Sequence, residues 1–319
     1  MVIISEEYSE LEHYNYDNSI VTVGSFDGLH LGHQKIFQKM HDLSLKYKNS
    51  NKILITFDPH PYSVLNGDSN KKYYLSSTLQ DKVDVINSCE NIFIDVLVVL
   101  PFTKELSLVS ASKFLEQIIK SFNPTDIVMG HDNGFGHKRE GNVQFLNEKY
   151  QNKKFKIHEV KPKKNHDMSI VSSTLIREFI VGGNIKKGNL MLGRYYSVVG
   201  TVIKGDGIGK TINFPTINIS PLNQYQIIPA LGVYFVKIEI GNDIFDGMCN
   251  IGFRPTVTNS KEETIEIHIF RVETNKDFYN KKVKVFFVDF IRKEKKFKNI
   301  NLLKEQLEKD KQFCLSVKV

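Results

Sequence analysis

The amino-acid sequence predicts an α/β domain with a doubly wound parallel sheet, followed by a small antiparallel β-barrel that ends in a helix. Three observations predict this fold class. An apolar run at residues 20–23 leads into a glycine-rich turn and a helix, strand-like and helix-like segments alternate up to about residue 185, and short β-rich segments follow. We therefore expect one domain over residues 1–185 and a second over residues 186–319.

The glycine-rich turn at residues 24–34 organises the first domain. Ile36 and Met40 recur at helix spacing after it, so a strand, a turn and a helix N-terminus meet within a short stretch. Backbone N–H groups and the dipole at a helix N-terminus favour an anion such as phosphate. His30 and His33 can face one site there, and imidazole can donate to phosphate oxygens. The turn predicts a nucleoside triphosphate site.

Zinc binding is the alternative for such a histidine pair, and glycines after a strand are common in any α/β protein. A zinc site needs about three or four ligands, and no cysteine or third histidine lies close to His30 and His33 in the sequence. Phosphate binding is the better supported of these interpretations.

The other elements of the first domain follow in alternation. Strands are expected at residues 52–57, 95–100, 126–129 and 155–159, and helices at residues 77–89 (capped by Ser76 or Ser77), 110–121 and 142–150. The continuous β-branched and leucine run at 95–100 suits a strand buried on both faces. Doubly wound sheets bind ligands at the carboxyl ends of their strands, where Gly24, Asp58 and Gly130 are expected.

The second domain is expected to be β-rich. Glycines at 182, 183 and 193 punctuate the chain before it, and glycine, proline, asparagine and aspartate separate its strands, which is typical of a small antiparallel barrel. The strands are expected at residues 197–203, 216–219, 232–240, 244–251, 264–270 and 283–290, and a final helix at 302–314.

Composition indicates a folded protein without a membrane-spanning segment. Hydrophobic residues make up 41% and charged residues 25% of the chain. No apolar run approaches the ~20 residues that cross a bilayer, and residues 1–12 lack a signal-peptide pattern, so the cytoplasm is the expected location. Cys89, Cys249 and Cys314 are scattered, which favours reduced thiols over a disulfide framework. The net charge of +7 lies largely in short runs typical of solvated faces.

Two more segments of the first domain carry polar groups. Residues 130–136 follow a strand, and by themselves they could form a flexible turn. Residues 171–177 open a helix that Ser172 or Ser173 could simply cap. In the functional alternative, the hydroxyls, the backbone N–H groups and Arg177 bind a triphosphate.

Two segments of the second domain alternate polar and apolar residues. Thr216 and Asn218 share one strand face, and Glu266 and His268 share a face in the same way. A solvent-facing strand would give this pattern too. The residues alone therefore leave both a ligand site and a polar surface open.

Together these strings resemble the bacterial bifunctional riboflavin kinase/FAD synthetase (FMN adenylyltransferase) family, over about residues 15–312. In the first domain, G-x-F-D-G-x-H-x-G-H-Q, T-F-x-P-H-P and S-S-T-x-I-R resemble the family's HIGH-type nucleotidyltransferase motifs. The resemblance implies adenylyl transfer from ATP to FMN, whose anionic phosphate needs no general base. Asn133 stands where the family usually has an aromatic residue. The implied site residues are catalytic His30, His33 and Arg177; nucleotide-binding Gly24, Phe26, Asp27, Gly32, Ser173 and Thr174; and flavin-binding Phe57, Pro59, His60, Pro61 and Asp132.

In the second domain, G-D-x-x-G-K, F-P-T-x-N and E-x-H resemble the riboflavin kinase site of the same family. The resemblance implies that Glu266 is the base toward the riboflavin 5′-hydroxyl, which is a poor nucleophile without one. It further implies nucleotide binding by Gly205, Gly209, Lys210 and Asn218, flavin binding by Arg254, and Mg²⁺ held with ATP by Thr216 and Asn218. Ile208 and Arg271 depart from residues that the family often has.

The sequence thus predicts an enzyme that phosphorylates riboflavin to FMN and adenylylates FMN to FAD. We expect ATP, riboflavin and FMN as partners, Mg²⁺ as cofactor, no nucleic acid and no membrane, and a monomer or weak homo-oligomer. Two alternatives are open. Only one module is active, which the departures at Asn133, Ile208 and Arg271 motivate, or the chain is a basic flavin- or RNA-binding regulatory protein.

Overall fold

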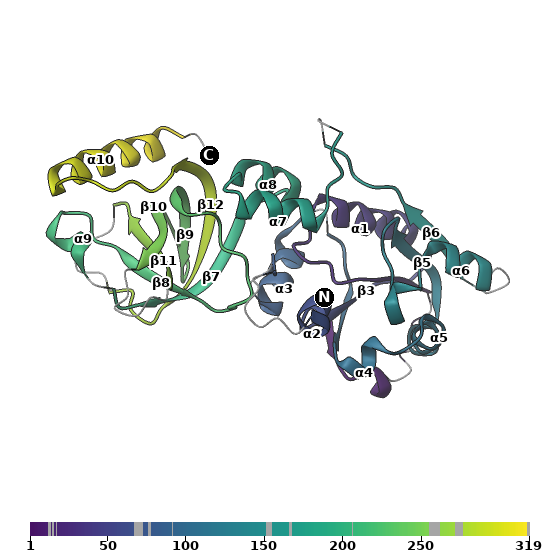
Figure 1. Cartoon of the computed structure of the whole chain (residues 1–319). Coiled ribbons are helices and arrows are strands. Elements are labelled where there is room, and N and C mark those ends of the chain that lie inside the picture. The colour runs from purple at the N-terminus through teal and green to yellow at the C-terminus, as the bar shows by residue number, and fades with distance from the viewer. Residues whose placement is uncertain are drawn as a thin grey trace. The chain divides into compact units, whose positions relative to one another are not determined.

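The computed structural model describes residues 1–317 except 12, 13, 15, 17, 67–72, 76, 77, 91, 151–154, 166, 167, 206, 255–261 and 272–276. At residues 208, 210, 254 and 262 it describes the backbone alone. The helix cap predicted at Ser76 or Ser77 lies outside the described residues. Contacts divide the chain into two units, Met1–Tyr73 with Lys82–Ser172 (unit 1) and Tyr74–Asp81 with Ser173–Val319 (unit 2) (Figure 1). The domain boundary between residues 185 and 186 stays a prediction.

Unit 1 alternates strands and helices. In chain order it contains β1 (Val2–Ser5), η1 (Tyr8–Glu10), β2 (Asn18–Val23), α1 (Leu31–Ser44), β3 (Ser50–Asp58), α2 (Pro61–Asn66), most of α3 (Leu79–Ser88), β4 (Val96–Pro101), α4 (Lys104–Ser107), α5 (Ala111–Phe122), β5 (Pro124–Gly130), η2 (His137–Arg139), α6 (Val143–Lys149) and β6 (Lys156–Val160).

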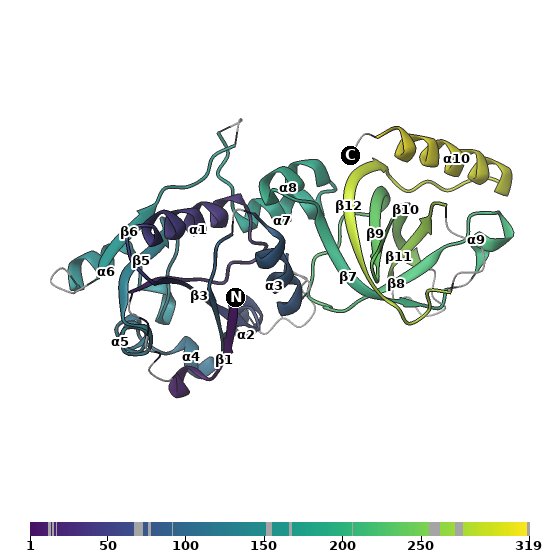
Figure 2. The ribbon, with the colours of Figure 1, turned by 180° about the vertical axis from the view of Figure 1, so that it is seen from behind.

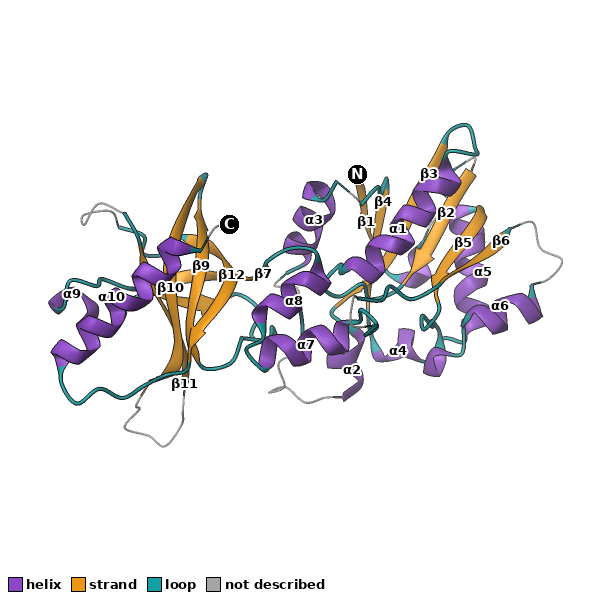
Figure 3. Cartoon of the chain, turned by 90° about the horizontal axis from the view of Figure 1, so that it is seen from above, coloured by secondary structure: helices purple, strands orange, loops and turns teal. Residues whose placement is uncertain are grey.

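Among the described residues, six strands form one sheet in the order β1-β4-β3-β2-β5-β6, and all of its strand pairs are parallel (Figure 3). Phe114 and Ile118 of α5 share a buried apolar cluster with Val21 of β2 and Ile127 of β5. The chain runs from β2 to β3 and β4 on one side and then returns to β5 on the other. The carboxyl ends of β2 and β5 therefore flank the switch point at which such sheets bind ligands.

Unit 2 begins with two helices and continues with a β-barrel. In chain order it contains α7 (Ser173–Val181), α8 (Ile185–Leu192), β7 (Tyr196–Ile203), α9 (Ile208–Thr211), β8 (Ile217–Pro221), β9 (Gly232–Ile240), β10 (Asp243–Arg254), β11 (Glu262–Ile269), β12 (Lys282–Arg292) and α10 (Ile300–Ser316). In the described part of the chain, six strands close into a barrel in the order β10-β11-β8-β7-β12-β9, and all of its pairs are antiparallel. The α/β sheet and the antiparallel barrel with a final helix confirm the predicted fold class.

Register shows which barrel residues face inward. Cys249 of β10 pairs with Ile267 of β11, and Ile251 pairs with Ile265. All four are at most 3% exposed, so they form part of the barrel interior. Successive residues point to opposite faces of a strand. Glu266, between the two isoleucines, therefore lies on the outer face.

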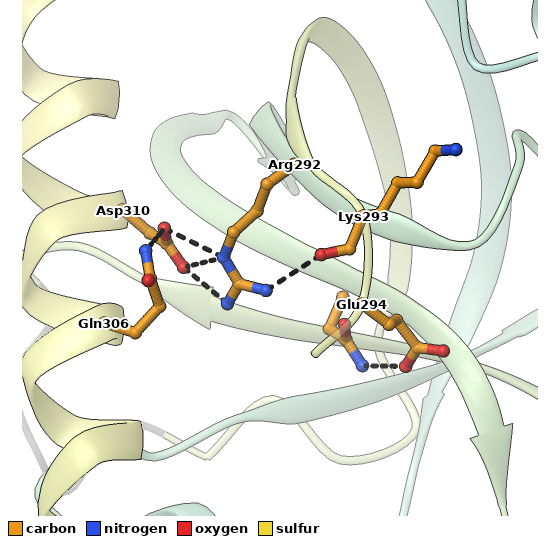
Figure 4. Close-up of polar contacts among 6 residues, drawn as sticks. Arg292, Lys293, Glu294, Gln306 and Asp310 are labelled. Atoms are coloured by element: carbon orange, nitrogen blue, oxygen red, sulfur yellow. Dashed lines mark hydrogen bonds and ion pairs between the residues drawn. The ribbon is translucent and has the colours of Figure 1, made fainter. Parts of the chain in front are cut away.

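Helix α10 covers part of that outer face. Leu307 and Cys314 of α10 pack with Phe235 of β9 and Met248 of β10. At the end of β12, the Arg292 Nε and Nη2 atoms donate to Asp310 Oδ2 at 2.9 and 2.7 Å, and Asp310 is 2% exposed (Figure 4). This buried ion pair ties α10 to the barrel.

A segment from the first half of the sequence also pairs with the barrel. The Tyr74 backbone N–H donates to the Tyr225 carbonyl oxygen, and the Ile227 N–H donates to the Tyr74 carbonyl oxygen, each at 3.0 Å. The Gln226 side chain, fully buried, donates to the carbonyl oxygens of Ser197 and Leu75. Residues 74–81 are thereby counted with unit 2.

Seven short elements were not predicted from the sequence: β1, η1, α2, α4, η2, α8 and α9. Strand β1, labelled in Figure 2, has four residues and pairs with β4. Such short elements carry too little periodicity for recognition. Among the described residues, no helix is both long and apolar enough to cross a membrane.

Candidate active sites

The turn between β2 and α1 has a constrained backbone. Phe26 and Leu29 adopt φ angles of 44° and 42°, and Gly28 has a φ of 80°. Bulky side chains rarely adopt positive φ, so surrounding contacts must hold the turn. Phe26 is 2% exposed, and its ring centroid lies 5.3 Å from that of Phe37 in α1. The buried Phe26 ring therefore anchors the turn to the helix.

His30 and His33 lie together at the N-terminus of α1. Their ring centroids are 3.6 Å apart with planes at 17°, and the Phe26 ring meets His33 edge-on at 5.1 Å. His30 caps the helix, because its Nδ1 accepts the His33 backbone N–H at 3.3 Å. A neutral His30 therefore carries its proton on Nε2, which can donate to an anion. The positive end of the helix dipole favours the same ligand.

Gly32 allows a close approach beside this pair. A Cβ at position 32 would lie 3.0 Å from His30 Cε1 and 3.2 Å from the Val171 carbonyl oxygen. A side chain here would displace the imidazole or the segment that precedes α7. Two other predicted residues belong to the same turn. The Gly24 N–H donates to the Ile55 carbonyl oxygen at 3.0 Å, and Asp27 is 3% exposed.

The predicted flavin-binding residues of unit 1 lie mostly at the carboxyl end of β3: Phe57, Pro59, His60 and Pro61. The Phe57 ring meets the Phe102 ring edge-on, with centroids 5.4 Å apart. Sequence analysis missed Phe102, because its position becomes meaningful only once β3 and β4 are known to be neighbours. His60 Nδ1 accepts the Tyr62 backbone N–H at 3.1 Å, which fixes one side of its ring.

The loop after β5 lies beside the end of β2. Asn133 Nδ2 donates to the Val23 carbonyl oxygen at 3.5 Å. Asp132 is exposed, and its carbonyl oxygen accepts Arg139 Nη2 at 2.7 Å. The residue that departs from the family pattern therefore bridges two strand ends at the switch point.

Ser173, Thr174 and Arg177 lie in the first turns of α7, which the contacts assign to unit 2. Ser173 and Arg177 are half-buried, and Thr174 is exposed. Their convergence with His30 and His33 on one ATP stays a prediction.

A row of polar residues crosses three neighbouring strands on the outer face of the barrel. Glu266 of β11 pairs with Asn218 of β8 on one side and with Asn250 of β10 on the other. Paired residues in antiparallel strands have Cα atoms only about 4.5–5.5 Å apart. Burial raises the pKa of the Cys249 thiol, and the nearby Glu266 carboxylate adds to this effect. The row places one carboxylate between two amides.

The loop before β8 packs closely on this row. A Cβ on Gly205 would collide with Asn218 Nδ2, so a larger residue here would have to displace that side chain. The Phe214 N–H donates to the Gly209 carbonyl oxygen at 2.9 Å, which closes the loop around α9. Thr216 directly precedes β8 and is half-buried, whereas Asn218 is 6% exposed. The side chains of Lys210 and Arg254 lie outside the described part of the structure.

Two further residues extend the row. Asn250 Nδ2 donates to Glu294 Oε1 at 3.5 Å, and a Cβ on Gly252 would collide with that carboxylate. Sequence analysis did not single out Asn250 or Glu294 as site residues. The register of β10 against β11 is the signal that finds Asn250.

His268, two residues after Glu266, is buried and has a structural role in the barrel. It is 8% exposed, and its Nδ1 lies 2.9 Å from the Pro215 carbonyl oxygen. Burial lowers the pKa of His268, and the hydrogen bond to Pro215 opposes this shift. A neutral His268 donates from Nδ1 and holds the start of β8 beside β11.

Comparison with known proteins identifies both modules. A family model described as FAD synthetase matches residues 13–175, and one described as riboflavin kinase matches residues 192–317. Curated proteins named bifunctional riboflavin kinase/FMN adenylyltransferase are similar over most of the chain. The protein of Buchnera aphidicola subsp. Schizaphis graminum is 37% identical over 92% of each chain, and that of Bacillus subtilis is 35% identical over 92% of this chain and 90% of its own.

A third such relative, from Listeria monocytogenes, is 33% identical over 97% of this chain and 94% of its own. A solved structure titled as a macrolide-efflux protein from Streptococcus pneumoniae has a TM-score of 0.86 at 26% identity and covers 100% of both chains, which supports the fold. The chain belongs to the bifunctional riboflavin kinase/FMN adenylyltransferase family.

Proposed function

We propose that this bifunctional riboflavin kinase and FMN adenylyltransferase runs its two reactions at the two sites described above. FMN is adenylylated at the turn between β2 and α1, and riboflavin is phosphorylated at the row formed by Asn218, Glu266 and Asn250. The observation that carries the proposal is the contrast in chemistry: stacked histidines on a helix N-terminus in unit 1, and a carboxylate between two amides in unit 2.

In adenylyl transfer, an FMN phosphate oxygen attacks the α-phosphorus of ATP, and the bond to the pyrophosphate leaving group breaks. Because the nucleophile is already anionic, the protein positions the two molecules and stabilises developing negative charge. His30 Nε2, His33 and the α1 N-terminus supply this stabilisation, and Gly24, Phe26, Asp27 and Gly32 shape the turn around the phosphates.

Ser173, Thr174 and Arg177 complete the same ATP site in this proposal. Val171, two residues upstream of Ser173, has its carbonyl oxygen beside Gly32, which supports the assignment. Phe57, Pro59, His60, Pro61 and Asp132 line the flavin, and the Phe102 ring packs edge-on against the Phe57 ring.

In the kinase reaction, Glu266 accepts the proton of the riboflavin 5′-hydroxyl as that oxygen attacks the γ-phosphorus of ATP, and ADP leaves. Asn218 and Asn250 hold the carboxylate in place from the neighbouring strands. Gly205, Gly209 and Lys210 bind the nucleotide, and Arg254 binds the flavin.

The residues around Asn218 fit a magnesium ion. Thr216 and Asn218 offer side-chain oxygen atoms, the kind of ligand that Mg²⁺ prefers. Mg²⁺ takes few protein ligands and keeps waters and phosphate oxygens, and no cluster of three or more histidine, cysteine or acidic side chains suited to a metal occurs among the described residues. Thr216 and Asn218 would hold the ion, which neutralises ATP phosphate charge when bound.

The proposal also covers the setting of the enzyme. The free thiols of Cys89, Cys249 and Cys314 support a reducing compartment, and we place the reactions in the cytoplasm. The module boundary at residues 185 and 186, a monomer or weak homo-oligomer, and the absence of a nucleic-acid partner remain predictions.

One assay tests the proposal. The full chain is incubated with riboflavin, ATP and Mg²⁺, and the flavins are separated by chromatography. FMN should appear first and FAD later, and adding EDTA should stop riboflavin phosphorylation. Formation of FAD from added FMN without any phosphorylation of riboflavin would show that the barrel is inactive.

A further inference from the structure

A buried lysine lies beneath the turn between β2 and α1. Lys82 of α3 is 8% exposed, and its Nζ donates to the Ser25 carbonyl oxygen at 2.9 Å and to Thr56 Oγ1 at 3.1 Å. Thr56 of β3 is fully buried, and its Oγ1 donates to the same Ser25 carbonyl oxygen at 3.1 Å. Two donors from different elements thus hold one carbonyl group.

That carbonyl group belongs to the residue just before the strained part of the turn. Phe26 follows with a φ of 44°, and it contacts His33, which stacks on His30. A bulky residue keeps a positive φ only when its surroundings fix it. The Ser25 carbonyl is a point at which Lys82 can set the direction of the turn and the placement of the histidine pair.

Lys82 is also influenced by two carboxylates, those of Asp27 and Asp58. Burial lowers the pKa of Lys82, and the charges of Asp27 and Asp58 act in the opposite direction. Burying an ammonium group is costly unless it is paired and hydrogen-bonded. Asp27 lies in the turn and Asp58 ends β3, so without Lys82 both would repel an ATP phosphate bound at the strand ends.

We propose that Lys82 is a positioning residue for adenylyl transfer, which holds the His30–His33 pair through the Ser25 carbonyl. The inference rests on the proposed function of that histidine pair. Lys82 needs no contact with either substrate to act in this way.

A matched pair of variants tests the inference. Lys82→Met removes the ammonium. Lys52→Met is the control, because Lys52 is also a largely buried lysine of unit 1, 12% exposed and 2.7 Å from Asp95, but it lies at the opposite end of β3. With FMN saturating, Lys82→Met should lower kcat/KM for ATP about 10²-fold, whereas Lys52→Met should stay within about threefold of the unchanged chain. Equal rates for the two variants would overturn the inference.

A second substitution separates positioning from stability. Thr56→Val keeps the side-chain shape and removes the other donor to the Ser25 carbonyl, and it should lower adenylyl transfer about tenfold. Because both donors act on one carbonyl, the Lys82→Met/Thr56→Val double variant should be no slower than Lys82→Met alone. Additive losses would overturn the inference. An unchanged rate with Thr56→Val would overturn it too, even if Lys82→Met failed to fold.

His33→Ala, assayed in parallel, tells the two hypotheses apart. If His33→Ala keeps the full adenylylation rate, the proposed site itself is wrong. If His33→Ala loses activity and Lys82→Met does not, only the role of Lys82 is wrong.

Discussion

In the proposed function, the two candidate sites perform the same task, the transfer of a phosphorus group from ATP to a flavin, with different parts of the polypeptide. In unit 1, a helix N-terminus and two stacked imidazoles gather at a strained turn. In unit 2, side chains from three paired strands form a row on the outer face of the barrel. The difference follows from the nucleophile, because FMN phosphate arrives charged whereas a hydroxyl must lose its proton. A site for the first needs donors, and a site for the second needs a carboxylate.

The largest expected effect comes from removing that carboxylate. Glu266→Gln should lower riboflavin phosphorylation about 10²–10⁴-fold, the range of a lost general base, and leave FMN adenylylation intact. Separate rates for the two reactions from one preparation measure this. Glu263→Gln is the control, since Glu263 lies exposed on the same strand. Equal losses in both reactions would contradict the proposal that each reaction has its own site.

Loosening the barrel should affect one reaction only. Asp310→Asn leaves the Arg292 charge partly buried without its counter-ion, and breaking such a pair costs about 3–5 kcal/mol. The barrel of the variant should then unfold at a lower urea concentration than that of the unchanged chain. Loss of riboflavin phosphorylation with increasing urea measures this unfolding. The exposed pair of Asp246 with Lys237, at 3.2 Å, serves as control, because Asp246→Asn should cost at most about 1 kcal/mol.

Removing one imidazole tests the candidate site of unit 1. His33→Ala should slow adenylyl transfer about 10²–10³-fold, the size of a lost transition-state donor, with riboflavin phosphorylation unchanged. His41→Ala in the last turn of the same helix is the matched control. Wild-type adenylylation by His33→Ala would contradict the assignment.

The smallest expected effect is a pH dependence confined to the barrel. Burial holds the pKa of His268 below its usual 6.5, so at a given pH His268 is less protonated in the folded chain than in the unfolded chain. The unfolded chain then binds more protons as the pH falls below about 6.5, and the barrel loses stability there. The urea concentration at which half of the riboflavin kinase activity is lost should be lower at pH 5 than at pH 7. The difference should be smaller in the His268→Gln variant. If the difference were equally large in His268→Gln, the pH dependence would come from other titratable groups.

Periodicity predicted the long elements well and the site geometry only in part. The run at residues 95–100 was predicted as a doubly buried strand, and β4 has its first five residues buried. The order of strands could not be read from the sequence, because pairing joins residues far apart in the chain. Phe102, Asn250, Glu294 and Lys82 were therefore missed, since each becomes notable only through a neighbour on another element.

The pairing of Tyr74 with the barrel has a practical consequence for dissecting the enzyme. A fragment that starts at residue 186 would lack the backbone groups of Tyr74 and Leu75 that the Ile227 N–H and the Gln226 amide bond in the whole chain. Water or a neighbouring molecule would have to satisfy these groups instead. A fragment cut at residue 186 would thus expose these groups, and an added peptide spanning residues 73–81 should bind to the fragment and satisfy them.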